Sequence, residues 1–183
     1  MERTELEKIR LEKIEQMRSE GIDPYPLRSH VTHRNQEAIT AFEAHEQSGN
    51  EEPLTATVAG RIRAMRLMGK VAFFHIEDGS GRIQLFFRVN EIGPEGLQVL
   101  KDLFDNGDYI EAQGTLFRTK TGEISVHVQS FRMLSKAVTP LPAAKDEVVD
   151  GQVVRHATLN DPETRYRQRY ADLAVNPEVR EIF

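Results

Sequence analysis

The chain has no cysteine among its 183 residues, which excludes a disulfide framework, a zinc-thiolate site and a cysteine nucleophile. No apolar run is long enough to cross a membrane, and the charged N-terminal stretch has no apolar core of the kind found in signal peptides. We therefore expect no membrane partner. The absence of cysteine fits a reducing compartment, and we expect a cytoplasmic protein.

Positive charge is also in short supply, since 24 Lys and Arg face 29 Asp and Glu for a net charge of −5. The surface as a whole does not attract polyanions, so any nucleic-acid binding requires a local basic patch.

Motifs for catalysis are absent as well: there is no P-loop, nucleophile elbow, metalloprotease motif or kinase signature. Gly79 and Gly81 lie between two predicted strands, which indicates a turn and not a phosphate loop. His30 and His33 have a spacing that suits a metal, but no carboxylate cluster frames them, and a surface or packing role is favoured. We expect no catalytic centre, bound cofactor or metal in this chain.

Residues 1–53 predict an N-terminal helical extension. Thr4 and Glu7 form a capping box at the start of one helix, and Gly21 and Pro24 predict its end. Its apolar residues fall on one stripe that we expect to dock on the rest of the protein: Leu6, Ile9, Ile14 and Met17. A second helix is predicted over Asn35–Gln47, closed by Ser48 and Gly49.

Residues 54–135 alternate in hydropathy as five strands, with one helix between the third and fourth. The helix has Pro94 in its first turn and ends at Asn106-Gly107. The predicted inward residues are, strand by strand, Ala56, Val58, Gly60 and Ile62; Ala72, Phe74 and Ile76; Ile83, Leu85, Phe87 and Val89; Ile110, Ala112, Gly114 and Leu116; Ile124, Val126 and Val128. The order β-β-β-α-β-β is that of a five-stranded oligonucleotide-binding (OB) barrel, so we predict a β-rich α+β fold.

In an OB fold the second and third strands and the loops one–two and four–five form the binding face. Phe73 is predicted to point outward there and could stack on an unpaired base. Gln84 has donors and an acceptor for a Watson–Crick edge, and Glu123, in the four–five hairpin, suits base N–H groups. Arg61, Arg63, Arg66 and Lys70 lie within ten residues with no acid between them, the last two in a predicted loop over 64–70.

Further contacts with RNA are predicted from outward or loop residues on the same elements: Phe86, Arg88, Arg118 and Lys120. Each candidate alone has an ordinary explanation. An outward Phe73 packs across strands in many sheets, Gln84 could be merely solvated, and Arg61 and Arg63 could protect the sheet face. Their placement on one face favours the binding interpretation.

The C-terminal quarter differs in character. Residues 136–164 predict an irregular linker, and residues 165–183 the start of another domain. Asn160 to Glu163 and Asn176 to Glu178 each combine a capping residue, proline and an acid, which is typical of helix starts. The second of these helices stops at Phe183 without a stop signal, from which we expect a truncated chain.

The whole chain resembles the N-terminal part of bacterial lysyl-tRNA synthetases, class II enzymes related to the aspartyl and asparaginyl synthetases. The runs that carry the resemblance occur in order along the chain: Gly21-Ile22-Asp23-Pro24-Tyr25-Pro26, Val58-Ala59-Gly60-Arg61, Met68-Gly69-Lys70, Gly81-Arg82-Ile83-Gln84-Leu85, Thr119-Lys120-Thr121-Gly122-Glu123, Pro140-Leu141-Pro142, Arg165-Tyr166-Arg167-Gln168-Arg169-Tyr170 and Asn176-Pro177-Glu178-Val179-Arg180. The Met-Gly-Lys and Thr-Lys-Thr-Gly-Glu runs favour the lysyl branch.

The resemblance implies that this part binds the uridine-rich anticodon of lysine tRNA. It implies that Phe73 stacks on an anticodon base, that Gln84 reads a base, and that Arg66 and Glu123 complete the site. The full enzyme would use ATP and magnesium to attach lysine to tRNA and would be a homodimer. Its catalytic motifs would lie beyond Phe183, so this chain alone is expected to bind tRNA without catalysing the reaction.

Two departures from the family's pattern concern the linker. A segment with Trp- or Phe-His-Gly-Leu is absent, residues 143–164 form a longer run in its place, and Ala171 replaces the usual leucine. Two alternatives stay open: a free-standing OB module that binds single-stranded RNA, and a relative of the aspartyl or asparaginyl synthetases.

Overall fold

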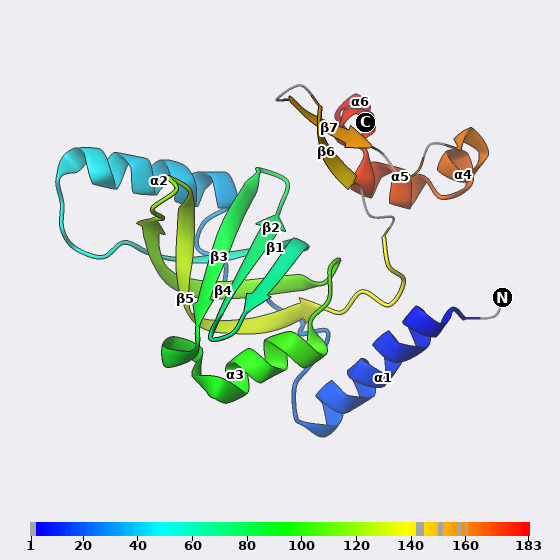
Figure 1. Cartoon of the computed structure of the whole chain (residues 1–183), viewed down its shortest axis with the longest axis horizontal. Helices are drawn as coiled ribbons and strands as arrows, with labels where there is room; N and C mark the ends of the chain where they lie inside the picture. The colour runs from blue at the N-terminus through cyan, green and yellow to red at the C-terminus, as the bar shows by residue number, and fades with distance from the viewer. Residues whose placement is uncertain (1–2, 142–144, 150–151, 157–158, 160) are drawn as a thin grey trace. The chain divides into compact units, whose positions relative to one another are not determined.

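The computed structural model describes residues 3–141, 145–149, 152–156, 159 and 161–183. The chain divides into two compact units, Met1–Val138 and Thr139–Phe183 (Figure 1). No helix of the described residues is both long enough and apolar enough to cross a membrane.

The predicted capping box opens helix α1 (Glu5–Ser19), where Thr4 Oγ1 accepts a hydrogen bond from the Glu7 N–H at 3.3 Å. The Glu7 carboxylate accepts in return from the Thr4 N–H at 2.9 Å. The predicted docking stripe is correct only in its second half. Ile14 and Met17 are buried, whereas Leu6 and Ile9 are 45% and 48% exposed, because the first turns of α1 extend past the surface against which α1 packs.

Helix α2 (Asn35–Ser48) ends at Gly49, which adopts the left-handed conformation that glycine favours. Its start is fixed to the β2–β3 turn. The Asn35 N–H donates to the Asp78 carboxylate at 2.9 Å, and the Asn35 side chain donates to the Gly81 carbonyl at 3.2 Å. Since Ala38 and Phe42 are also buried, the thin apolar face of this helix is sufficient to hold it on the domain.

The five predicted strands are β1 (Thr55–Met68), β2 (Val71–Glu77), β3 (Arg82–Arg88), β4 (Tyr109–Arg118) and β5 (Ile124–Ser135), with α3 (Val89–Leu103) between β3 and β4. They pair in the order β1-β2-β3-β5-β4 and close through β1 and β4. Only the β3–β5 pair is parallel among the barrel pairings. The OB-fold prediction is therefore confirmed, and α2 and α3 lie at opposite ends of the barrel in Figure 1.

The barrel core confirms the predicted alternation. Almost all the predicted inward residues are buried, including Val58, Phe74, Leu85, Ile110 and Val126. The exception is Val89, which starts α3 instead of extending β3. The α3 residues Leu100 and Leu103, with Phe104 after them, cover one end of the core.

The predicted loop over 64–70 is wrong, because β1 continues to Met68. The register shifts between Ile62 and Ala64 and then runs on to the pair Met68–Val71. Gly69, at φ 59°, supplies the left-handed residue of the tight turn that follows. The bulge places Arg66 on a strand, directly opposite Phe73.

The second unit contains a hairpin, β6 (Lys145–Val149) and β7 (Gln152–His156), where an irregular linker was predicted. The sequence has β-branched residues on both sides of Asp150-Gly151, a dipeptide typical of two-residue hairpin turns, and this signal was overlooked. The rest of the predicted 143–164 run lies in part outside the described residues.

Both predicted C-terminal helix starts are confirmed. Asp161 caps α4 (Pro162–Arg167), and Asn176 precedes α6 (Pro177–Ile182). Between them Gln168 leaves the helical conformation and separates α4 from α5 (Arg169–Val175), a break that the sequence did not predict. Arg165 and Arg169, one on each side of the break, both donate to the buried Asp172 carboxylate.

Candidate nucleic-acid interface

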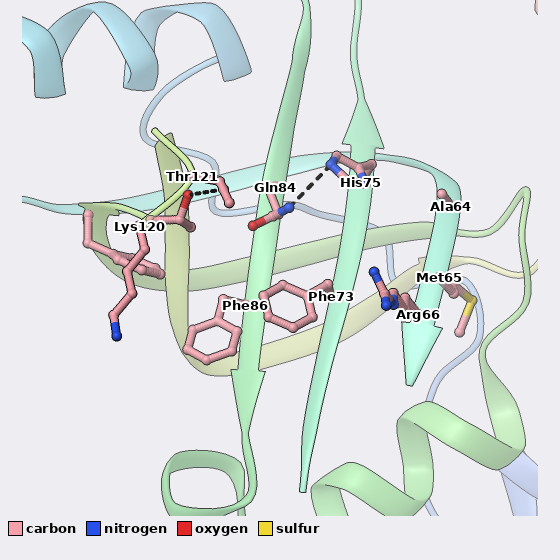
Figure 2. Close-up of a pocket in the computed structure, with 11 residues that line it drawn as sticks. Ala64, Met65, Arg66, Phe73, His75, Gln84, Phe86, Lys120 and Thr121 are labelled. Atoms are coloured by element: carbon pink, nitrogen blue, oxygen red, sulfur yellow. Dashed lines mark hydrogen bonds between the residues drawn. The ribbon is translucent and has the colours of Figure 1, made fainter. Parts of the chain in front are cut away.

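A groove of about 670 Å³ lies on the outer face of the barrel (Figure 2). It runs over β1, β2 and β3 and is bordered by the β4–β5 hairpin. Its lining includes three of the four predicted principal residues, Arg66, Phe73 and Gln84, and two of the predicted secondary ones, Phe86 and Lys120. The other lining residues are Ala64, Met65, His75, Phe117, Thr119 and Thr121.

Sheet register explains why one wall of the groove is aromatic. Arg66 pairs with Phe73, Phe73 with Phe86, and Phe86 with His127, so these side chains share the outer face across four strands. The Phe73 and Phe86 rings are stacked, with centroids 4.8 Å apart, and both side chains lie next to each other in Figure 2. The row continues from Phe86 to His127 at 5.5 Å and to Phe117 at 5.7 Å.

This geometry bears on the alternative explanation for Phe73. The ring does pack across the strands, because it stacks on Phe86. It also lines the groove and is only half-buried, so packing does not cover it. An apolar row of this kind offers flat faces on which unpaired bases can stack.

The polar end of the groove is a hydrogen-bonded chain. Gln84 is only 8% exposed because the β4–β5 hairpin covers it. Its Oε1 accepts from the Ser125 hydroxyl at 2.9 Å, and its Nε2 donates to Glu123 Oε2 at 2.7 Å. The other carboxylate oxygen of Glu123 lies 2.9 Å from His75 Nε2. Glu123, the fourth predicted residue, is thus in contact with two lining residues, Gln84 and His75, without being one itself.

The basic residues of the prediction do not all gather at the groove. Arg66 and Lys120 line the groove. Within the described part of the chain, neither side chain forms a hydrogen bond or an ion pair. Arg63 pairs with Glu77 of β2 at 3.0 Å, so an acid from the neighbouring strand interrupts the predicted positive cluster. Arg61 instead donates to the Tyr109 hydroxyl and lies over its ring at 4.7 Å.

The remaining predicted cations also lie outside the groove lining. Lys70 is in the β1–β2 turn and Arg88 is at the end of β3, both exposed. Arg118 donates to Glu46 of α2 at 2.6 Å and to the Gly122 carbonyl at 2.9 Å. The hydrogen bond from Arg118 lowers the pKa of Glu46, and the pair braces the hairpin that carries Glu123 against α2.

Sequence reasoning missed several residues of this site. His75, Phe117 and His127 were identifiable as outward residues from strand parity, but no motif marked them. Ser125 carried no signal, because its contact with Gln84 depends on the parallel β3–β5 pairing, which joins distant parts of the chain.

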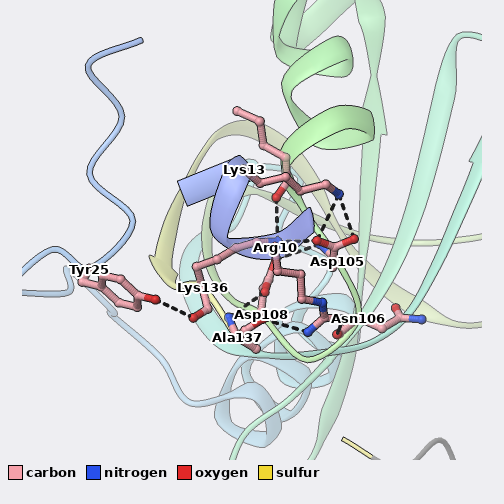
Figure 3. A network of polar contacts seen from close by, with 9 residues as sticks. Arg10, Lys13, Tyr25, Asp105, Asn106, Asp108, Lys136 and Ala137 are labelled. Carbon is pink, nitrogen blue, oxygen red and sulfur yellow. Dashed lines mark hydrogen bonds and ion pairs between the residues drawn. The ribbon is translucent and has the colours of Figure 1, made fainter. Parts of the chain in front are cut away.

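A second polar network joins the middle of α1 to the barrel (Figure 3), and none of its residues is among those that line the groove. Lys136 Nζ donates to Asp108 at 2.7 Å and to the Leu103 carbonyl at 2.8 Å, and the Lys136 and Asp108 side chains are fully buried. Arg10 of α1 donates to the Ala137 and Asn106 carbonyls. This network fixes α1 to the barrel.

Asp105 links this network to α1, since it accepts from both Lys136 and Lys13. Burial raises the pKa of the Asp105 carboxyl, but the hydrogen bonds from Lys136 and Lys13 outweigh it and hold this pKa below its ordinary value.

The groove combines stacking surfaces, two cations that are paired with no side chain among the described residues, and a carboxylate–amide–imidazole chain. Aromatic rings suit bases, Arg66 and Lys120 suit phosphates, and the polar chain suits the edge of a base. Its chemistry is that of a single-stranded nucleic-acid surface. Nothing among its lining residues resembles a nucleophile with an adjacent general base.

Comparisons with known proteins agree with this geometry. Residues 56–134 match the OB-fold nucleic acid binding domain family. The whole chain aligns with lysine–tRNA ligases of bacteria: it is 42% identical to that of Pelotomaculum thermopropionicum over 98% of the chain, 44% to that of Roseiflexus castenholzii over 100%, and 40% to that of Dehalococcoides mccartyi over 95%.

The chain covers 32%, 35% and 32% of these three ligases, so it spans about a third of the length of the curated relatives it matches. The match falls on their N-terminal regions. Residues 56–134 are thus an OB-fold domain of the anticodon-binding type, within a chain homologous throughout to the N-terminal region of bacterial lysine–tRNA ligases.

Proposed function

We propose that this chain is the anticodon-binding part of a lysine–tRNA ligase and that the groove binds the uridine-rich anticodon of lysine tRNA. The observation that carries the proposal is the joint placement of Phe73, Phe86, Arg66 and the Gln84–Glu123 pair around one groove. Phe73 supplies a stacking surface for a base, and Arg66 and Lys120 supply positive charge for the backbone of the anticodon loop.

The complete ligase that we propose would attach lysine to its tRNA with ATP and Mg²⁺, act as a homodimer and work in the cytoplasm. We assign ATP, Mg²⁺ and the chemistry to the remaining two thirds of such an enzyme. In support, the chain covers only 32% and 35% of the length of two lysine–tRNA ligases that it matches. The role of this chain is to select the tRNA.

Binding to anticodon stem-loops tests the proposal. The 183-residue chain should bind a stem-loop with the UUU anticodon of lysine more tightly than stem-loops with the GUC anticodon of aspartate or the GUU anticodon of asparagine. Equal affinity for all three would favour a general single-stranded RNA module. Tighter binding of GUC or GUU would favour the aspartyl or asparaginyl relatives.

An activity assay tests the division of labour. The purified chain should show no lysine-dependent exchange between ATP and pyrophosphate while it still binds the UUU stem-loop. Measurable exchange would contradict the assignment of catalysis to the rest of the enzyme.

A further inference from the structure

The contacts of His75 cannot all be hydrogen bonds at once. His75 Nε2 lies 2.9 Å from Glu123 Oε1 and 3.3 Å from Gln84 Nε2. Gln84 Nε2 is a donor, because Ser125 donates to the opposite amide atom and the Glu123 carboxylate accepts from Nε2 at 2.7 Å. A His75 nitrogen without hydrogen would place its lone pair against the carboxylate, so the shorter contact assigns the proton: His75 Nε2–H donates to Glu123.

Each carboxylate oxygen of Glu123 therefore accepts one hydrogen bond from the groove lining in the free protein. One is held by Gln84, which is buried, and the other by His75. The side chains of His75 and Glu123 are 32% and 44% exposed, so the imidazole side of the carboxylate is the accessible one. A base N–H that approaches Glu123 from the groove therefore meets Oε1, the oxygen that accepts from His75, and competes with the His75 N–H for it.

We propose that His75 is a specificity-determining residue that occupies, in the RNA-free protein, the Glu123 oxygen to which a base N–H binds. The inference rests on the proposed function, because it assumes that the groove holds an anticodon base. Uracil N3–H or guanine N1–H replaces one donor by another. Cytosine and adenine present a lone pair at that edge position, and this lone pair would oppose the carboxylate in place of a hydrogen bond.

Because a base N–H replaces the His75 N–H at Glu123, RNA binding should depend on the charge of His75. A protonated imidazole holds the carboxylate through a charge-assisted hydrogen bond, which a neutral base N–H displaces less readily. Charged groups on the same outer face as His75 include Glu123 and Lys120 of the hairpin, Arg66 of β1 and the Arg63–Glu77 ion pair of β1 and β2. Gln84, on β3, carries no charge.

The test is equilibrium binding of the 183-residue chain to the UUU stem-loop between about pH 8 and pH 5.5. Variant stem-loops identify the base that contacts Glu123. In these, each anticodon uridine is replaced in turn by cytidine or by N3-methyluridine, which lacks the N3–H. For the wild-type chain, affinity for UUU should fall roughly two- to fivefold toward low pH, the range of an exposed ion pair.

His75→Gln keeps an N–H donor that does not titrate, so it should remove the pH-dependent fall and keep the preference for uridine over N3-methyluridine. His75→Ala should also be independent of pH, and it should bind UUU at least as tightly as the wild type at low pH. His127→Gln, which removes the other histidine of this outer face, and His33→Gln, away from the groove, should both retain the fall.

A wild-type affinity that does not change with pH, or a fall that persists in His75→Gln, would overturn the inference. Two further variants separate this failure from failure of the proposed function. If Phe73→Ala and Glu123→Gln both bind UUU as tightly as the wild type, the groove is not the RNA site. If they bind weakly while His75→Gln behaves as the wild type, only the assignment of His75 fails.

Discussion

The two polar networks of the first unit are built from similar groups and serve different ends. In the network that joins α1 to the barrel, the Lys136 and Asp108 side chains are fully buried. At the outer face, His75 and Glu123 are partly exposed, and their carboxylate–imidazole contact borders an open groove. Hydrogen-bond lengths are alike in both, so burial separates the structural network from the one available to a ligand.

The largest effect should come from the buried network. Lys136→Met leaves Asp108 buried without its cation, which costs about 3–5 kcal/mol of unfolding free energy. Lys8→Met is the matched control, because Lys8 and Glu5 form an exposed pair on α1 that is worth about 0–1 kcal/mol. Urea unfolding of both variants measures the difference. A similar loss in the two would show that burial does not distinguish these pairs.

The second effect concerns binding and not stability. Phe73→Ala should weaken binding of the UUU stem-loop by about 1–3 kcal/mol, because it removes a stacking surface of the groove. Leu67→Ala, on the exposed end of β1 and outside the groove lining, should bind as the wild type does. Thermal unfolding checks that both variants fold. Collapse of the Phe73→Ala fold would instead assign Phe73 to packing alone.

A third effect distinguishes the cations of the outer face. If Arg66 contacts a phosphate, Arg66→Ala should lower the slope of log affinity against log salt by about one. Arg63→Ala should leave that slope unchanged, because Arg63 is held by Glu77. Binding titrations at several salt concentrations compare the two arginines. Equal slopes for both variants and the wild type would remove Arg66 from the phosphate contacts.

The smallest effect is the acid response of the buried network, since Asp105 is partly exposed and its ion pairs are screened. The lowered pKa of Asp105 means that its contribution to stability is fully present above the ordinary aspartate pKa of about 4. It is lost as the pH falls through the folded-state pKa. Urea unfolding should show a gap between the wild type and Asp105→Asn near neutral pH that narrows in acid. A constant gap would contradict this sign.

The sequence predicted the features of the fold that depend on neighbouring residues and not those that depend on distant ones. Alternation identified both the core residues, such as Phe74 and Leu85, and the outer-face residues Phe73 and Gln84, because strand parity is a local property. The exposure of Leu6 and Ile9 depends on which turns of α1 contact the barrel. The periodicity of the apolar residues carries no information on this.

The errors at the site have the same origin. Arg63 looked available within its own stretch of chain, but its acid partner Glu77 comes from the next strand. The bulge between Ile62 and Ala64 changed the predicted loop into a strand and placed Arg66 opposite Phe73. Strand parity does predict that His75 points outward. Its contacts with Glu123 and Gln84, which would indicate a role in the site, are not predictable from its own stretch of chain.

The parallel pairing of β3 with β5 has a consequence for the order of folding. The β1–β2, β2–β3 and β4–β5 hairpins join neighbouring segments, whereas the Ser125–Gln84 hydrogen bond at the β3–β5 seam spans 41 positions. Contacts between distant segments carry the higher loop-closure cost, so we expect this seam to form late, together with the β1–β4 pairing, which joins Thr55 to Thr115. The polar chain that faces the groove crosses the seam. The protein should therefore acquire its binding surface only as the barrel shuts, and an RNA bound there should in turn slow its opening.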